Sequence, residues 1–332
     1  MPRTIQRRRL VSAGLLAAIP LALRKSLGQP VAPASAARVG WLAGSAGTLP
    51  TPAYLEAMRE GLRERGWVEG RNLRIDERWG DRESAARLTA DLLRMRPQVL
   101  VAQGAMVLGA LHVESTVPIV FGFSGDPVEA GLVASFARPA GRLTGIAMQS
   151  LELVGKRLEI LKELMPHLKR VAILANPAHP GEQLELRASR TAADRLGLVV
   201  QYLPVTSARD FEVAFPALLR ERAEAIVAFP DALVMSQAKV IAEFANRYRV
   251  PAVSGWSEFA DEGNLLTYGP NLRSTWNQAA GVVDRILRGA RPAEIPVEQP
   301  SSFELVINQR AAEALGLTIP SAVALRAERF LR

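Results

Sequence analysis

The chain of 332 residues contains no cysteine. Disulfide bonds, thiolate nucleophiles, cysteine-ligated metals and a lipid-modified cysteine are therefore all excluded. Histidine is also scarce, and the three histidines lack the i, i+4 or paired spacing of a metal-binding motif: His112, His167 and His179. Because His179 follows an expected strand, it is the histidine that could reach a ligand cleft. We expect no metal site.

Motifs for catalysis and cofactor binding are missing as well. No G-x-S-x-G elbow, phosphate-binding loop or S-x-x-K sequence stands in a context that supports catalysis. Gly40, Gly44 and Gly47 are spaced G-x-x-x-G-x-x-G, whereas dinucleotide binding requires G-x-G-x-x-G. Asp76, near the end of the second expected strand, stands where a ribose-binding acid could be. The sequence indicates neither an enzyme nor a bound cofactor.

Acidic residues are absent from the first 37 positions. A basic start at Arg3 and Arg7–Arg9 precedes the apolar run Leu10–Leu23, and the small residues Ala34–Ala37 follow. This layout is typical of a secretory signal peptide with a small-x-small cleavage site. The apolar run of 14 residues contains Pro20 and is shorter than the roughly 20 residues of a bilayer span, which disfavours an uncleaved membrane anchor. The paired arginines also fit a twin-arginine signal. We therefore expect export to the periplasm.

The basic character of the chain belongs largely to this leader. Six of its residues are basic, so the net charge of +8 for the whole chain falls to about +2 for residues 38–332. Nucleic-acid binding requires basic residues clustered on one face, and a net charge of about +2 does not indicate such a cluster. The hydrophobic content of 48% and the charged content of 22% are ordinary for a globular protein. The 295 residues after the leader exceed the usual size of a single core, which predicts two lobes.

Short apolar runs alternate with amphipathic stretches in the first part of the chain. The expected strands are 38–43, 72–79, 98–102 and 118–123. The expected helices are 52–67, 83–94 and 105–113. Helices between continuous apolar strands predict βαβ units and a parallel sheet.

The same alternation starts again after residue 150. The expected helices are 152–164, 181–196, 210–220, 236–248, 272–288 and 309–315. The expected strands are 170–174, 198–205, 225–229, 251–254, 264–268 and 303–307. The predicted fold class is α/β, with two doubly wound parallel-sheet lobes joined by hinge crossings near 145–150 and 291–300. The predicted lobes comprise residues 38–147 plus about 269–298, and residues 148–268 plus about 299–332.

Ligands approach the carboxyl ends of strands in open parallel sheets, so the loops that follow the strands are the candidate site. The residues chosen from these loops are Ser45, Thr48, Gly104, Ala105, Ser124, Asp126, Asn176, Asp231, Trp256, Ser257 and Glu258. Hydroxyls and helix N-termini would hold a ligand carboxylate. Asp126 or Asp231 would hold an amino group, and Trp256 would stack on an apolar or planar body.

Structural alternatives exist for the most prominent of these residues. Asp126 followed by Pro127 also fits a simple helix start, and Asp231 after a strand fits the same interpretation. Trp256 could instead pack under its loop, because tryptophan is mostly buried. Trp41 and Tyr268 are weaker candidates for ligand stacking.

Four segments, taken in order, resemble the signature blocks of the ABC transporter substrate-binding protein family: Pro118–Val133, Ala137–Ala147, Ser254–Asn271 and Pro296–Pro320. The similarity extends from Arg38 to Arg332. It implies a type I periplasmic-binding-protein fold, in which a small molecule is trapped between two lobes, and it implies no catalytic activity. The implied partners are the ligand and an ABC permease with its ATPase.

The resemblance also bears on the ligand. Some relatives bind tryptophan or other aromatic amino acids and carry an acid followed by Asn-Thr where this chain has Asp231-Ala232-Leu233. We expect a soluble, monomeric periplasmic protein that captures an amino acid or a related small carboxylate and delivers it to the permease. An exported ligand-sensing receptor module and an α/β enzyme are the alternatives.

Overall fold

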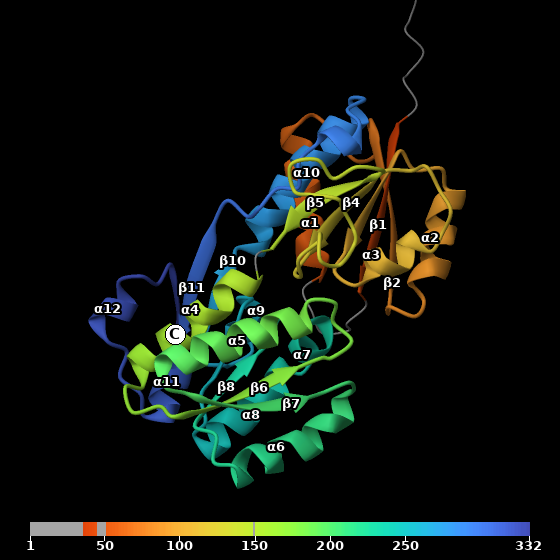
Figure 1. Cartoon of the computed structure of the whole chain (residues 1–332). Coiled ribbons are helices and arrows are strands. Elements are labelled where there is room, and N and C mark those ends of the chain that lie inside the picture. The colour runs from red at the N-terminus through yellow and green to blue at the C-terminus, as the bar shows by residue number, and fades with distance from the viewer. Residues whose placement is uncertain (1–35, 45–50, 149) are drawn as a thin grey trace, which may run out of the picture. The chain divides into compact units, whose positions relative to one another are not determined.

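The computed structural model describes residues 36–44, 51–148 and 150–332, which belong to one compact unit, Ser35–Arg332 (Figure 1). The predicted signal peptide lies outside the described residues, apart from its last two positions. Two of the candidate site residues, Ser45 and Thr48, also lie outside them.

Five strands of the described residues form a parallel sheet, the first sheet, in the order β2-β1-β3-β4-β5. The strands are β1 (Ala37–Gly44), β2 (Leu73–Gly80), β3 (Val99–Gln103), β4 (Ile119–Phe123) and β5 (Leu143–Ala147). The inner strands β3 and β4 are almost entirely apolar, as is typical of strands that are covered by helices on both faces of a sheet. The chain leaves β1 first toward β2 and later returns on the other side to β3. This reversal is a topological switch point between β1 and β3.

Two pairs of helices cover the first sheet. One face holds α1 (Thr51–Glu64) and α10 (Leu272–Leu287), which pack against each other, and the other holds α2 (Ala85–Arg94) and α3 (Met106–Leu111) (Figure 1). Trp41 of β1 lies in the core on the α1 and α10 side, where its ring centroid is 5.0 Å from that of Trp276 on α10. A helix from late in the sequence therefore completes the core of the first sheet.

Seven strands of the described residues form the second sheet, in the order β12-β11-β10-β9-β8-β6-β7. Its strands are β6 (Arg170–Ala175), β7 (Val199–Pro204), β8 (Ala225–Ala228), β9 (Ala252–Ser254), β10 (Leu266–Pro270), β11 (Phe303–Asn308) and β12 (Arg329–Leu331). The remaining helices are α4 (Ser150–Leu164), α5 (Glu182–Leu196), α6 (Phe211–Arg220), α7 (Ala232–Ser236), α8 (Ala238–Tyr248), α9 (Glu258–Asp261), α11 (Gln309–Leu315) and α12 (Ser321–Ala324). Short 3₁₀ turns occupy Ala208–Asp210 and Pro292–Glu294. A second switch point lies between β6 and β8.

The predicted α/β class is confirmed, with two mainly parallel sheets. One pairing differs from the expectation, because β10 and β11 are antiparallel. The chain leaves the second sheet after β10, forms α10 on the first sheet, and returns to β11 from the opposite direction. The expected helix over 236–248 is interrupted at Gln237, whose backbone φ of −103° and ψ of 11° separate α7 from α8. The limits of the two lobes stay a prediction.

The crossing from β10 into α10 offers a stability test. The Asn271 side chain accepts a hydrogen bond from the Ser274 N–H at 2.9 Å and so caps α10. We expect Asn271→Ala to lower the free energy of unfolding by about 1 kcal/mol, the usual loss for such a cap. Urea denaturation measures the change. Asn246→Ala, on the exposed face of α8, is the matched control and should change stability far less; equal effects of the two changes would contradict the capping role.

Candidate functional site: a cavity at the strand ends of both sheets

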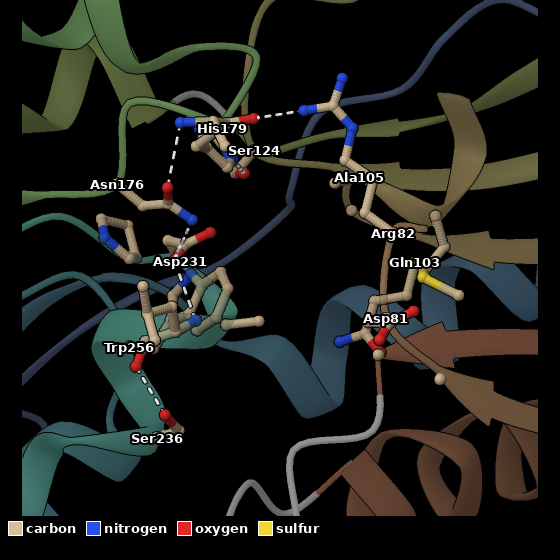
Figure 2. A pocket seen from close by; sticks show the side chains of 18 of the residues that line it. Asp81, Arg82, Gln103, Ala105, Ser124, Asn176, His179, Asp231, Ser236 and Trp256 are labelled. Carbon is tan, nitrogen blue, oxygen red and sulfur yellow. Dashed lines mark hydrogen bonds between the residues drawn. The ribbon is translucent and has the colours of Figure 1, made fainter. Parts of the chain in front are cut away.

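A cavity of about 580 Å³ lies at the carboxyl ends of both sheets (Figure 2). Its lining comes from the ends of β1, β2, β3 and β4 and from the loops after β6, β8 and β9. Both switch points open into it, since Gly44 and Gln103 end β1 and β3, while Asn176 and Pro230 follow β6 and β8. The rule that ligands bind at switch points therefore applies to the two sheets at once.

Six of the predicted site residues line this cavity: Gly104, Ala105, Ser124, Asn176, Asp231 and Trp256. Asp126 does not line it, because its carboxylate accepts hydrogen bonds from the N–H groups of Val128 at 2.7 Å and Glu129 at 3.1 Å. Those bonds match the alternative interpretation of Asp126 as a cap.

The structure places Ser257 and Glu258 outside the cavity lining, at the start of the short helix α9. The Glu258 side chain is half-buried, with its Oε2 inaccessible, and lies beside Tyr54 of α1; burial, the largest influence, raises the pKa of this carboxyl. The loop after β9 thus presents Trp256 to the cavity and turns its next two residues away.

Sequence reasoning missed two parts of the cavity lining. Gly80 ends β2 and is followed by Asp81 and Arg82, while Ser236 ends α7 and is followed by Gln237. Gly80, Asp81 and Arg82 lie at the carboxyl end of a parallel strand, where ligands usually bind, so the sequence position of β2 is a signal for them. The alternating sequence of β2 is typical of an edge strand. In Figure 2, Asp81, Arg82 and Gln103 lie on one side of the cavity, while Asn176, Asp231 and Trp256 lie on the other. His179, singled out in the sequence for its position after a strand, also lines the cavity.

Asp231 is held in a fixed orientation. As the N-cap of α7, its Oδ1 accepts hydrogen bonds from the N–H groups of Leu233 at 2.8 Å and Val234 at 3.4 Å, and from Asn176 Nδ2 at 3.2 Å. The described residues give Oδ2 no hydrogen bond, so this oxygen is free to accept one from a ligand. The capping and cavity-lining interpretations of Asp231 therefore hold together.

His179 and Ser124 form a pair whose geometry resembles that of a nucleophile and its base. His179 Nε2 lies 2.7 Å from Ser124 Oγ, and the Gly181 N–H donates to His179 Nδ1 at 3.2 Å. Because Nδ1 accepts, the proton of the neutral ring is on Nε2, which then donates to Ser124. A base would need Nε2 as an acceptor, so this tautomer does not activate the serine. Burial lowers the pKa of His179, against the opposing effects of Asp231 and Glu182, and keeps the ring neutral.

A buried arginine supports the turn that carries Trp256. The Arg157 side chain is fully buried in α4, and its Nε donates to the Tyr268 carbonyl at 2.9 Å. A Cβ at position 255 would collide with Arg157 Nη2, which explains the glycine before Trp256. Burial lowers the pKa of Arg157 to about 10 and raises the pKa of the neighbouring Glu185 carboxyl to about 8. The positively charged Arg157 side chain thus lies behind the turn that carries Trp256 and supports it from the protein interior.

No group of three or more histidine, cysteine, aspartate or glutamate side chains among the described residues could hold a metal ion. No helix within residues 36–44, 51–148 and 150–332 is long and apolar enough to cross a membrane.

The sequence matches a known family over most of its length. The sequence pattern of the family described as ABC transporter substrate binding protein matches residues 52–331. A protein of Clostridioides difficile (strain R20291), named tyrosine-binding protein, is 21% identical over 259 residues, which cover 77% of this chain and 74% of that protein.

Solved structures share the fold. A conserved domain protein from Vibrio cholerae O1 biovar eltor str. N16961 superimposes with a TM-score of 0.83 at 27% identity and covers 89% of this chain and all of that one. An ABC domain from Streptococcus pneumoniae, in complex with L-Trp, gives a TM-score of 0.81 at 21% identity, with 90% and 100% covered. The type I periplasmic-binding-protein fold implied by the four sequence blocks is confirmed.

Proposed function

Because this chain belongs to the ABC transporter substrate-binding protein family, a family of binding proteins rather than enzymes, we propose that it captures an amino acid or a related small carboxylate and delivers it to an ABC permease. The observation that carries this proposal is a single cavity with a free carboxylate oxygen, a guanidinium group and an apolar wall. Its volume of about 580 Å³ is within the range of ordinary small-molecule sites.

Each part of the cavity suits one part of such a ligand. Asp231 Oδ2 would accept from an ammonium group, as a charge-assisted hydrogen bond. Arg82 and Ser124, from the loops after β2 and β4, would receive the ligand carboxylate. Trp256, together with Met106, would contact an apolar or aromatic body.

The relatives support an aromatic amino acid as the first ligand to test. One is named a tyrosine-binding protein, and another was solved with L-Trp. Ala232 and Leu233 stand where relatives of the aromatic-binding kind carry Asn-Thr, and both line the cavity. Their apolar side chains favour a ligand body with fewer polar groups on that side.

Capture and delivery would follow from movement of the two sheets. The ligand meets the loops of one sheet, closure brings the loops of the other over it, and the closed form docks on the permease with its ATPase. We propose that this takes place in the periplasm, after removal of residues 1–37, and that the protein is a monomer.

A thermal-shift screen of the purified protein tests the proposal. L-Tyrosine, L-tryptophan, the other amino acids and small aromatic acids form the panel. A compound at 100 times its Kd should stabilise the protein by about 2.7 kcal/mol. Mass spectrometry of small molecules that purify with the protein widens the search beyond the panel. The absence of any bound compound in both experiments would contradict a solute-binding role.

A further inference from the structure

Two loops from different sheets meet at the edge of the cavity without intervening side chains. Gly125 follows β4 and Gly181 precedes α5. A Cβ at position 181 would lie 2.8 Å from the Gly125 Cα, and one at position 125 would lie 3.2 Å from the Gly181 Cα. Both distances are shorter than an ordinary van der Waals contact, and a side chain at position 181 in particular would push the two loops apart.

Two hydrogen bonds flank the glycine contact. One is the 2.7 Å bond between His179 Nε2 and Ser124 Oγ, and the other runs from Arg82 Nη1 to the Ala178 carbonyl at 2.8 Å. Each joins a residue beyond a first-sheet strand to the loop after β6. We call these two bonds and the Gly125–Gly181 contact the clasp.

We propose that the clasp stabilises the closed form of the cavity relative to the open form and that protonation of His179 weakens it. The inference rests on the proposed function only in taking the cavity to be the ligand site. The neutral ring accepts from the Gly181 N–H at Nδ1. The protonated ring carries a proton on both nitrogens. Its Nδ1–H would then face the Gly181 N–H, two donors in opposition, and the turn that brings Gly181 against Gly125 would have to move.

Charged groups from three elements surround His179. Asp231 begins α7 and Glu182 begins α5, and each carboxylate favours the protonated ring. Arg82, on the first-sheet side, bonds to the neighbouring residue Ala178. Burial outweighs the two carboxylates, so the pKa of His179 in the closed form is lowered.

Behind Gly181, α5 and the elements around it hold three more titratable groups. Burial raises the pKa of Glu185 to about 8, so this carboxyl stays mostly protonated between about pH 5 and pH 7 and does not change charge there. Arg157, with a pKa of about 10, stays charged throughout. Tyr202 lies beside Glu182, and burial raises the pKa of its phenol. His179 is therefore the group of this set expected to respond as the pH falls from 7.

The sign of the pH effect follows from proton counting. Separation of the loops exposes His179 to water, where its pKa returns to the ordinary value of about 6.5. The closed form then binds fewer protons than the open form, so acid favours opening. The ratio of open to closed protein should rise by up to tenfold for each pH unit below about 6.5, until the lowered pKa of the closed form is reached.

A distance measurement without ligand tests the clasp. The chain has no cysteine of its own, so Glu83→Cys and Gln183→Cys introduce two labelling sites at exposed positions, one before α2 and one on α5. Double electron–electron resonance between nitroxides at these sites reports the separation of the loops. We expect a short-distance population at about pH 7 that shrinks in favour of longer distances toward about pH 5.

Three variants assign the effect. His179→Gln can still donate to Ser124 but does not titrate in this range, so its distances should not depend on pH. Ser124→Ala removes the acceptor and should enlarge the long-distance population at both pH values. Gly181→Ala should do the same by steric collision with Gly125.

His167→Gln is the matched control, because His167 is exposed and should leave the pH response intact. Distances that are equal at both pH values in the unmodified background would overturn the proposal, and so would a pH response that persists in His179→Gln. Since no ligand is used, a negative result here leaves the thermal-shift screen as a separate test of ligand binding.

Discussion

Replacing Asp231 by asparagine is expected to weaken ligand binding by roughly 30- to 1000-fold, which corresponds to about 2–4 kcal/mol for a buried charge pair that loses one partner. The asparagine Oδ1 can still cap α7 through the N–H groups of Leu233 and Val234, so the helix start should persist. What is lost is the negative charge at Oδ2, the oxygen that faces a ligand ammonium group in the proposed complex. Isothermal titration with the tightest compound from the thermal-shift screen measures the loss.

Asp126→Asn is the matched control for this substitution. Like Asp231, Asp126 lies in a loop after a strand and its carboxylate caps backbone N–H groups, but it lies outside the cavity lining. We expect its affinity for the same compound to stay within about twofold of the unmodified protein, as for a change that removes no ligand contact. Equal losses in the two variants, or full affinity in Asp231→Asn, would exclude Asp231 as the ammonium-binding group.

Replacing Trp276 by alanine is expected to cost about 3–5 kcal/mol of unfolding free energy, the usual range for a buried large aromatic residue. Trp276 is 1% exposed, and its ring centroid lies 5.0 Å from that of Trp41 and 6.5 Å from that of Tyr54. A Cβ at Gly122 would lie 2.6 Å from the Trp276 ring, which shows how closely α10 packs on β4. Alanine would leave a cavity between α10 and the first sheet. Guanidinium or urea denaturation, with the m-value checked for change, measures the loss.

Trp67→Ala provides the comparison for Trp276→Ala. The Trp67 indole is partly exposed and donates a hydrogen bond to Asp284 Oδ1 at 2.7 Å, so it also joins α10 to the first-sheet side, but from the surface. We expect a loss of about 1–2 kcal/mol from that change. A Trp276→Ala protein no less stable than Trp67→Ala would contradict the central position of Trp276 in this core.

The parts of the fold that could be predicted are those set by local pattern. β3 and β4 are continuous apolar runs, and such runs between amphipathic helices predict a parallel sheet covered on both faces. Parallel strands bring their carboxyl ends to one edge of their sheet, so the pattern predicts the ligand site among the loops at these edges, which include Ser124 in the first sheet and Asn176 and Asp231 in the second; the cavity lies there. The length of the chain and the second run of alternating strands and helices predict two such sheets, and the four family blocks add the role of an ABC transporter substrate-binding protein.

The parts that could not be predicted depend on contacts between distant residues. No local signal shows that β11 pairs antiparallel with β10, because the intervening residues first form α10 on the other sheet. The sequence around Glu258 is equally compatible with a side chain in the cavity and with one turned toward Tyr54. Arg157 stands in the middle of an amphipathic helix, where the sequence pattern predicts a solvent-exposed charge. Its burial depends on contacts with the Tyr268 carbonyl and Gly255, which are distant in the sequence.

The origin of α10 has a consequence for the nascent chain. The strands of the first sheet are complete at Ala147, but the helix that covers Trp41 ends at Leu287, 140 residues later. A ribosome that adds about 5–20 residues per second needs on the order of ten seconds to synthesise that stretch. Throughout that interval α1 alone covers this face of the first sheet, and Trp41 lacks its contact with Trp276, so part of the apolar surface is available to chaperones or to other unfinished chains. The order of synthesis, and not the strength of the first five strands, thus determines when this core closes.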